Sequence, residues 1–415
     1  MTPTQIDATR SALAMVLPMR HPADAALSHF FRENPKLGGR DRAFIAEAVY
    51  GVVRHLRSLE TLCDGRNGRQ LLLAWLARHG GHNLREFEAI TREDEFKWLK
   101  EIKAAQLTDR PAAVQLDLPD WLYEQLHESY GERLPELMRA LNRPAPLDLR
   151  VNPMNSDRDA ILAQLKAEGF AAEATPYSPL GIRLKDKPAL QKHPLFLNGQ
   201  VEVQDEGSQL LGLLMAPKRG EMVCDFCAGA GGKTMLLGAL MRSTGRLYAF
   251  DVSEKRLNNL KPRLKRSGLS NVQAQLIANE RDTKVKRLAA KFDRVLVDAP
   301  CSGTGTLRRN PDLKWRQTPE ALTELNAKQE SILRSAATLV KIGGRLVYAT
   351  CSLLREENEA VVEAFLTAHA EFKLVPAGEV LAAQHIGLAM GDYLRLDPAR
   401  HGTDAFFAAV LERTA

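Results

Sequence analysis

The stretch Asp225-Phe226-Cys227-Ala228-Gly229-Ala230-Gly231-Gly232-Lys233-Thr234 follows an apolar run and opens a segment with a helical pattern. Strand, glycine-rich turn and helix in this order are typical of a doubly wound α/β sheet, where glycine lets backbone approach a ligand and the helix start offers free amides. Gly232-Lys233-Thr234 matches the end of a phosphate loop, but Cys227 stands where that loop needs its first glycine. The stretch therefore predicts a cofactor site at a strand end, and not a phosphate loop.

The pattern on both sides of this loop predicts the architecture of residues 207–415. Short apolar runs alternate with helical segments, which indicates a parallel, doubly wound, Rossmann-like sheet. The predicted strands are Met222–Phe226, Leu247–Asp251, Gln273–Ile277, Arg294–Asp298, Arg345–Ala349 and Ala405–Leu411.

Two further domains are predicted ahead of this sheet. Apolar residues recur every three or four positions across residues 1–143, which indicates an all-helical domain that ends at Pro144-Ala145-Pro146. Residues 144–206 form a small α/β module. Its predicted strands are Leu147–Val151, Gly181–Leu184 and Val201–Val203, and its predicted helix is Asp157–Gly169.

Composition limits the class of protein. Of 415 residues, 45% are hydrophobic and 26% charged, which is ordinary for a globular protein and excludes wholesale disorder. No apolar run approaches the roughly 20 residues of a membrane span. Asp7 beside Arg10 makes the N-terminus a poor secretory signal. We expect a cytoplasmic protein without membrane contact.

Positive charge is concentrated in one segment. The net charge is +6, yet residues 255–316 alone hold 16 basic and 5 acidic side chains. Such a run is often only a solvated surface, but its position beside the candidate site favours a nucleic-acid partner, because phosphate contacts supply most of that affinity.

The cofactor predicted for the glycine loop carries an adenosine. The next strand ends in Asp251, about 20 residues after the glycines, where an acidic residue accepts from ribose hydroxyls. These residues alone do not distinguish a dinucleotide cofactor from S-adenosylmethionine. Cys224-x-x-Cys227 suggests zinc, but two further ligands are lacking nearby, so we expect a buried strand cysteine and no metal.

Two more cysteines follow predicted strands. Cys301 stands in Asp298-Ala299-Pro300-Cys301-Ser302, and Cys351 in Thr350-Cys351-Ser352. In a sheet of this class the fourth and fifth strands are neighbours, so both thiols are expected to face one cleft at the strand ends. A single cysteine is more often a buried apolar group, and a disulfide is not expected in a reducing compartment.

Paired thiols at a cofactor cleft suit methylation of a pyrimidine. Carbon 5 of that ring is a poor nucleophile until a thiolate adds to carbon 6; a base then removes the carbon 5 proton and the thiol leaves. The thiol must ionise, and free cysteine has a pKa of about 8.5. Asp298 can bond the ring nitrogen or the 4-amino group of cytosine.

The motifs together resemble the Sun/RsmB-type (NSUN-like) RNA (cytosine-5-)methyltransferase family. The resemblance rests on the glycine loop, both cysteine motifs, and the stretches Arg308–Trp315 and Glu356–Glu359. Leu149–Asn152 and Val203–Glu206 resemble the family's small RRM-like module, and Arg40–Ala43 and Tyr50–Arg54 resemble the NusB-like RNA-binding domain of bacterial members. The resemblance implies a class I S-adenosylmethionine methyltransferase fold after these two domains.

The resemblance also implies roles for individual residues. It makes Cys351 the nucleophile and Cys301 the thiol that assists product release, an assignment that spacing alone leaves open. S-adenosylmethionine, with S-adenosylhomocysteine as product, would be held by Cys227, Ala228, Gly229, Ala230, Gly231, Gly232, Lys233, Asp251, Asn279 and Asp298. Asn279 takes the place of the family's usual acidic residue near the adenine, with Asp282 as the alternative.

The predicted substrate is ribosomal RNA, with transfer RNA as the alternative, and the chain is expected to be a monomer. A non-catalytic ribosome assembly factor and a DNA cytosine methyltransferase are the rival functions; the intact cysteines disfavour the first, and the Thr-Cys-Ser motif disfavours the second. The residues expected to contact RNA are Arg150, Lys261, Lys265, Arg308, Arg309 and Lys314.

Overall fold

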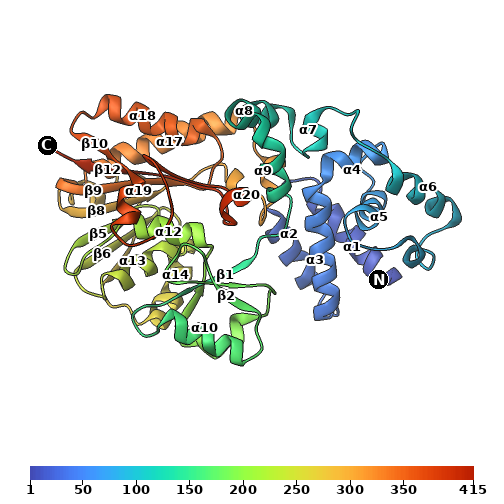
Figure 1. Cartoon of the computed structure of the whole chain (residues 1–415), viewed down its shortest axis with the longest axis horizontal. Coiled ribbons are helices and arrows are strands. Elements are labelled where there is room, and N and C mark those ends of the chain that lie inside the picture. Colours follow the sequence, from blue (N-terminus) through green and yellow to red (C-terminus); the bar gives the residue numbers. More distant parts are fainter. The chain divides into compact units, whose positions relative to one another are not determined.

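The computed structural model describes residues 1–415, which form two compact units. The first unit combines residues 1–144 with 306–319, and the second combines 145–305 with 320–415. Figure 1 labels most of the helices and strands of both. None of the helices has the length and apolar character needed to cross a membrane.

The first unit is helical, as predicted for residues 1–143. Local chemistry sets its helix starts: Thr2 and Gln5 form a capping box ahead of the first helix, and Asn67 caps the fifth. The NusB-like character stays a prediction. The helices are α1 (Pro3–Val16), α2 (Ala23–Glu33), α3 (Gly39–Arg54), α4 (Leu56–Cys63), α5 (Gly68–Arg78), η1 (Leu84–Phe87), α6 (Glu93–Ala104), α7 (Ala112–Gln115), α8 (Asp120–Tyr130), η2 (Gly131–Arg133), α9 (Leu134–Leu141) and α16 (Leu313–Arg316).

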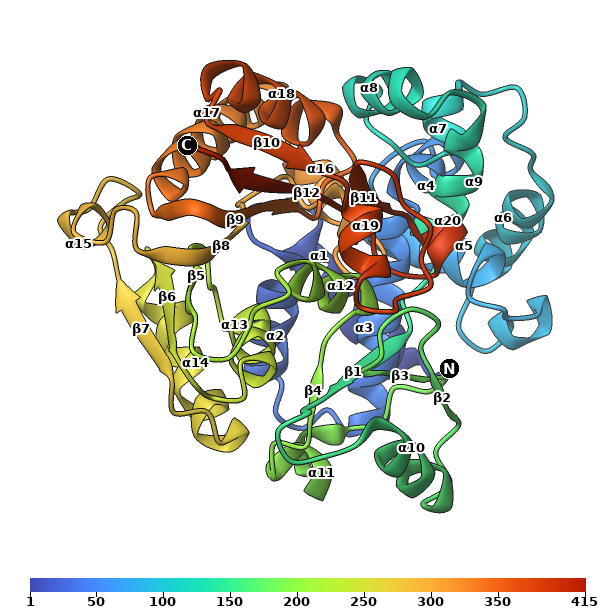
Figure 2. The same cartoon turned by 60° about the vertical axis from the view of Figure 1, so that its left-hand side comes forward.

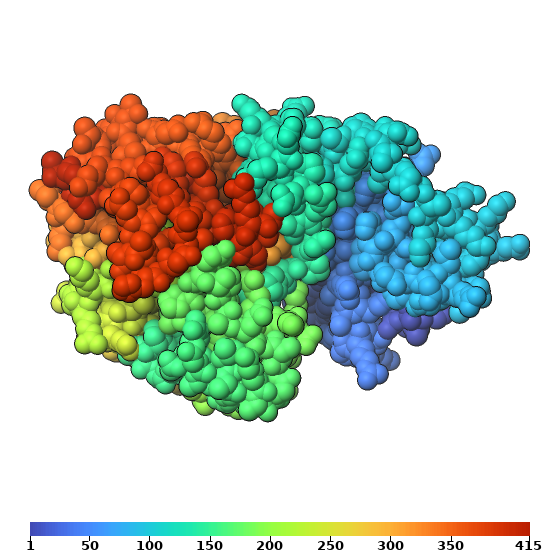
Figure 3. All heavy atoms as spheres, in the orientation of Figure 1, coloured from blue at the N-terminus to red at the C-terminus, as the bar shows by residue number.

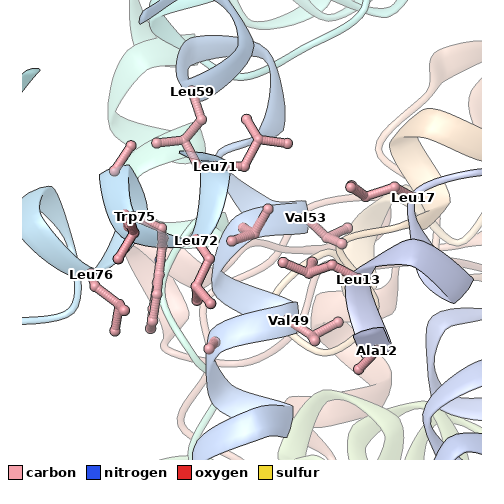
Figure 4. Close-up of a cluster of buried hydrophobic side chains, with 14 of the residues drawn as sticks. Ala12, Leu13, Leu17, Val49, Val53, Leu59, Leu71, Leu72, Trp75 and Leu76 are labelled. Atoms are coloured by element: carbon pink, nitrogen blue, oxygen red, sulfur yellow. The ribbon is translucent and has the colours of Figure 1, made fainter. Parts of the chain in front are cut away.

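The core of this unit forms where α1, α3 and α5 meet. Leu13, Val53 and Leu72 are fully buried there, and Figure 4 shows their side chains between the three helices. Gly51 lies against the indole of Trp75. A Cβ added at position 51 would come within 2.0 Å of the ring. The close approach of α3 and α5 therefore depends on glycine at position 51.

The segment 306–319 is part of this helical unit although it follows Cys301 closely in sequence. Ala23 N donates to Asp312 Oδ2 at 3.2 Å, and Trp315 Nε1 donates to Val53 O at 2.8 Å. The side chain of Trp315 packs on the helical core. The sequence had assigned this segment to the domain of residues 207–415, because nothing in it signals its distant partners.

The second unit begins with a small antiparallel sheet in the order β2-β3-β1-β4. Asp157 caps α10 by accepting hydrogen bonds from two backbone amides. Gly169 follows the end of this helix with φ +89°, and the sequence predicts both the helix and its terminal glycine. In Figure 3 the green atoms of this module lie directly beside the red C-terminal atoms. The elements are β1 (Leu147–Val151), α10 (Arg158–Ala167), β2 (Ala172–Ala174), β3 (Gly181–Leu184), η3 (Leu190–Lys192), α11 (Pro194–Leu197) and β4 (Val201–Val203).

The large sheet of the second unit has eight strands in the order β10-β12-β9-β8-β5-β6-β7, with β11 paired to β12. Its strands are β5 (Met222–Asp225), β6 (Arg246–Asp251), β7 (Val272–Leu276), β8 (Phe292–Asp298), β9 (Val340–Thr350), β10 (Phe372–Val375), β11 (Tyr393–Leu396) and β12 (Phe406–Arg413). Its helices are α12 (Glu206–Leu214), α13 (Gly232–Leu240), α14 (Glu254–Ser267), α15 (Thr283–Lys286), η4 (Thr304–Thr306), α17 (Pro319–Ala337), η5 (Arg355–Glu357), α18 (Glu359–Ala368), α19 (Ala377–Ala382) and α20 (Pro398–His401).

The prediction of a parallel sheet is right for five strands and wrong for the last. β7, β6, β5, β8 and β9 are parallel neighbours, and β8 and β9 lie side by side as expected. The C-terminal strand β12 is antiparallel to β9, and β10 and β11 are antiparallel to β12. Apolar runs alone do not reveal strand direction, so the mixed character was not visible in the sequence.

Helices cover both faces of this sheet, and the alternation of side chains along β9 shows how. Leu346 and Tyr348 belong to the cluster that contains α17 and α18. Val347 and Ala349 belong to the opposite cluster, which contains α12, α13 and α19. Figures 1 and 2 show these two helix layers on opposite sides of the sheet. Burial on both faces leaves the strand ends as the place for a ligand.

Candidate active site

A cavity of about 490 Å³ lies at the carboxyl ends of β5, β6, β8 and β9. Every residue that lines it belongs to the second unit. The lining comprises Gln204, Ser208, Asp225, Phe226, Cys227, Ala228, Gly229, Ala230, Gly232, Lys233, Asp251, Val252, Arg256, Ile277, Glu280, Asp298, Ala299, Pro300, Cys301, Lys328, Ile332 and Cys351.

The glycine loop between β5 and α13 is shaped by two left-handed glycines. Gly229 has φ +56° and Gly231 has φ +83°, a region that other residues rarely adopt. A Cβ on Gly231 would lie 2.0 Å from Leu260 Cδ1, so this glycine also lets α14 pack against the loop. Gly229 N donates to Asp251 Oδ2 at 2.8 Å, which fixes the loop to the end of β6.

Asp225, at the end of β5, presents an unsatisfied acceptor. Its side chain is buried, and Thr234 Oγ1 donates to its Oδ2 at 2.7 Å, whereas its Oδ1 has no hydrogen-bond partner. Burial, with a contribution from the nearby Asp298 carboxylate, raises the pKa of Asp225 to about 7. A buried acceptor without a partner in a cavity wall is suited to a donor group of a ligand.

Lys233 and Asp298 form an ion pair across the cavity. Lys233 Nζ lies 2.7 Å from Asp298 Oδ2. Burial alone would lower the pKa of Lys233, but the carboxylates of Asp298 and Asp225 outweigh it and the pKa is raised. The ammonium stays charged and orients Asp298, whose Oδ1 has no bond within the protein.

Cys301 and Cys351 face each other in the same cavity. Their Sγ atoms are 3.3 Å apart, and both are free thiols that are partly exposed. The hydrogen bond with Cys351, together with burial, raises the pKa of Cys301 well above its ordinary value. Cys301 therefore keeps its proton and can donate it toward the sulfur of Cys351.

A fully buried carboxylate connects the two cysteine loops. Glu357 accepts hydrogen bonds from the hydroxyls of Ser302 and Ser352, the residues that follow the two cysteines. Its Oε1 also accepts from Ser302 N at 2.8 Å and from Gln329 Nε2 at 2.9 Å. One side chain thus holds both loops in register.

Asn358 adds a second connection to the Cys351 loop. Its Oδ1 accepts from Thr350 Oγ1, and its Nδ2 donates to Ser352 O at 3.0 Å. Thr350 and Ser352 are the two neighbours of Cys351, so the backbone on both sides of that thiol is fixed.

The structure corrects the residue expected near an adenine. Asn279 is exposed, does not line the cavity, and accepts from Arg281 N. Asp282 caps α15 and also lies outside the lining. Glu280 lines the cavity instead and pairs with Lys328 at 2.6 Å. Gly231 also does not line the cavity, because it packs on Leu260.

Three residues expected to contact RNA are buried, which corrects their interpretation. Arg150, Arg308 and Lys314 are 3%, 7% and 0% exposed. Arg150 donates to Gly232 O at 2.7 Å, and Lys314 donates to Arg54 O at 2.8 Å, so both stabilise the fold. Arg309 is partly exposed, and Lys261 and Lys265 of α14 are exposed.

Sequence reasoning missed several residues of the site. Glu280 stands next to Asn279, so a shift of one residue in the predicted strand end would have found it. Glu357 stands in the motif Glu356–Glu359, in which no sequence signal distinguishes it from Glu356. Gln329 and Lys328 come from the middle of α17, where no local signal marks them.

No group of three or more His, Cys, Asp or Glu side chains is arranged to hold a metal ion. Cys224 is fully buried, and burial raises its pKa well above its ordinary value. It serves as a small apolar core residue of β5.

Comparisons with known proteins agree with this geometry. The family model described as 16S rRNA methyltransferase RsmB/F matches residues 212–412, and the ferredoxin-like domain of RsmF/B-like methyltransferases matches residues 118–191. A probable ribosomal RNA small subunit methyltransferase B from Synechocystis is 32% identical over 425 residues, covering 94% of this chain and 95% of its own. The chain belongs to the RsmB/F family.

Further relatives extend the RsmB/F match. A protein of the same name from Bacillus subtilis is 35% identical, covering 90% of this chain and 78% of its own. The solved structure of PH0851 has a TM-score of 0.80 and 26% identity, and covers 100% of this chain and 99% of its own. The chain is therefore a methyltransferase with a Rossmann-like domain, a ferredoxin-like domain and a helical N-terminal region.

Proposed function

We propose that this chain transfers a methyl group from S-adenosylmethionine to carbon 5 of a cytosine in small-subunit ribosomal RNA. The observation that carries the proposal is the pair of thiols, Cys301 and Cys351, whose sulfurs lie 3.3 Å apart in the cavity wall. The names of the relatives, which are ribosomal RNA small subunit methyltransferases, support the class of substrate.

The cavity fits S-adenosylmethionine. Its volume of about 490 Å³ lies within the range of small-molecule sites, roughly 300–1,000 Å³. The unpartnered Asp225 Oδ1 suits the ammonium of the cofactor, and Asp251 suits its ribose hydroxyls. Val252 and Ile277 offer apolar surface for the adenine, and Glu280 an acceptor for its amino group. When bound, S-adenosylmethionine supplies an electrophilic methyl group.

Cys351 acts as the nucleophile in this proposal, as the family resemblance implies. Its thiolate adds to carbon 6 of the cytosine, which makes carbon 5 nucleophilic. Cys301 keeps its proton and donates a hydrogen bond to the sulfur of Cys351. Asp298, oriented by Lys233, bonds the pyrimidine through its remaining oxygen.

Release reverses the covalent step. After carbon 5 has taken the methyl group, a base removes the carbon 5 proton. The electron pair restores the double bond between carbons 5 and 6, and Cys351 leaves as a thiolate. The Cys301 thiol donates a hydrogen bond to this leaving sulfur, so it assists release.

Exposed basic residues of α14 supply phosphate contacts for the RNA. Lys261 and Lys265 are exposed on a helix whose start, at Glu254, follows the cavity residues Asp251 and Val252. Replacing both lysines with glutamine should weaken RNA binding and reduce its salt dependence.

The deciding experiment is nucleoside mass spectrometry. The wild-type chain and Cys351→Ser are incubated with isotope-labelled S-adenosylmethionine and unmodified ribosomal RNA, transfer RNA or partly assembled small subunits. Labelled 5-methylcytosine in ribosomal RNA, lost in the variant, is the expected result. Label retained in Cys351→Ser would move the nucleophile to Cys301. Label in transfer RNA alone, or in none of the three substrates, would refute the proposal.

A further inference from the structure

The helical unit contains a second cavity, of about 470 Å³, which the proposed reaction does not use. Helices α3 to α5 form one wall, and residues of α7 and α9 with the loops after them form the other. Four arginines line it: Arg54, Arg78, Arg139 and Arg143. The cavity is large enough for a nucleotide-sized ligand.

Arg54 is a buried cation without an acidic partner. It is 7% exposed, and its Nη2 donates to Arg308 O at 3.0 Å, but its Nε has no hydrogen-bond partner. No carboxylate forms an ion pair with it. Burial lowers the pKa of Arg54 to about 10, so it stays charged at neutral pH. Buried guanidinium groups ordinarily pair with an anion. Arg54 has no such partner, so an anionic ligand could pair with it.

The other arginines of the cavity also lack acidic partners. Arg78 donates to two carbonyls, Ile102 O at 2.6 Å and Ala105 O at 2.9 Å. Arg139 and Arg143 are exposed and form no ion pair. None of the four arginines of the cavity therefore forms an ion pair with a carboxylate.

The acidic residues in the lining do not cancel this charge. Asp117 is 3% exposed and already accepts from Ser58 N at 2.9 Å and pairs with His55 Nδ1 at 3.0 Å. Glu47 is exposed and forms no ion pair. Four arginines against these two carboxylates leave a positive surplus for a ligand.

We propose that this cavity binds a phosphate group of the RNA substrate, held by the guanidinium groups of Arg54, Arg139 and Arg143. A guanidinium offers a planar fork of donors that matches phosphate oxygens. The inference rests on the proposed RNA substrate and adds to it a contact in the helical unit. A small phosphate compound would use the same chemistry, and the experiment separates the two sources.

The first arm measures RNA affinity against salt concentration. The affinity for a labelled fragment of unmodified small-subunit ribosomal RNA is measured for three proteins. These are the wild type, Arg139→Gln/Arg143→Gln, and the control Arg32→Gln/Arg85→Gln. The control removes two exposed, unpaired arginines of the same unit that do not line the cavity. For single-stranded contacts, loss of this one phosphate contact should lower the slope of log affinity against log salt by about 0.7 in the first variant only.

The second arm uses inorganic phosphate alone. The melting temperature is measured in millimolar phosphate and in chloride at equal ionic strength. Phosphate should raise it more for the wild type and the control than for Arg139→Gln/Arg143→Gln. Arg54→Gln should abolish the shift; if that variant does not fold, the exposed double variant still decides the question.

Each outcome has one meaning. The proposal is overturned if the cavity variant binds RNA like the control and phosphate shifts none of the proteins differently. A phosphate shift without any effect on RNA binding assigns the cavity to a small phosphate compound and refutes the RNA contact. Normal RNA binding through these arginines without formation of 5-methylcytosine would refute the proposed function and leave this site intact.

Discussion

Cys301 Sγ and Cys351 Sγ lie 3.3 Å apart, although 50 residues separate them in the chain. Neighbouring parallel strands β8 and β9 bring them together, because each cysteine follows the carboxyl end of its strand. At this distance the two thiols are in hydrogen-bond contact.

Replacing Cys301 with alanine should trap the RNA on the enzyme. Cys351 can still add to carbon 6, but the donor that assists its departure is gone, so a covalent adduct accumulates. Denaturing electrophoresis of Cys301→Ala with substrate RNA should show a slowly migrating band. Cys301→Ala/Cys351→Ser is the control and should show none; a band in this control would place the bond on another residue.

Glu357→Gln should reduce methylation while leaving cofactor affinity unchanged. Glutamine has one acceptor oxygen where the carboxylate receives four hydrogen bonds, so buried donors lose partners at a cost of about 1–3 kcal/mol each. The cysteine loops then lose their common anchor, and kcat should fall more than KM rises. Glu356→Gln is the matched control. Equal kcat in both variants would contradict the positioning role.

Gly231→Ala should destabilise the second unit and weaken cofactor binding together. The added methyl group meets Leu260 Cδ1 at 2.0 Å in a left-handed backbone conformation. Gly268→Ala, with φ +75° and open space around its Cβ, suffers only the backbone cost of about 1–2 kcal/mol. Urea unfolding should show a larger loss for Gly231→Ala. Similar losses in both would mean that α14 moves away freely.

Lys314→Met should flatten the pH dependence of stability above neutral pH. Burial lowers the pKa of Lys314 to about 7, whereas an unfolded lysine titrates at about 10.4. Between these values the unfolded chain holds a proton that the folded chain lacks, so the free energy of unfolding rises with pH. Denaturant unfolding from pH 7 to 10 measures this rise, which Lys261→Met should preserve. An unchanged rise in Lys314→Met would show that the lysine titrates normally.

The sequence predicted the elements that local chemistry determines. The strand ends Asp251 and Asp298, the turn glycines Gly229 and Gly231, and the helix that ends before Gly169 all lie where their patterns placed them. These features depend on neighbours in the chain, so a single sequence reveals them.

Features that depend on distant partners were not predictable. Lys314 reads as a surface cation, and its burial follows only from its bonds to Arg54 and Asn142, more than 170 residues away. The role of Glu357 depends on Ser302, and the direction of β12 depends on its pairing with β9. Such contacts leave no periodic or compositional signal.

Because residues 306–319 complete the helical unit, that unit cannot finish folding when the ribosome has synthesised residue 144. About 175 further residues must emerge before Trp315 can donate to Val53, which takes roughly 9 to 35 seconds at about 5–20 residues per second. During this interval the nascent helices expose the apolar surface that Trp315 covers in the folded unit. An isolated fragment of residues 1–144 would retain that uncovered surface permanently.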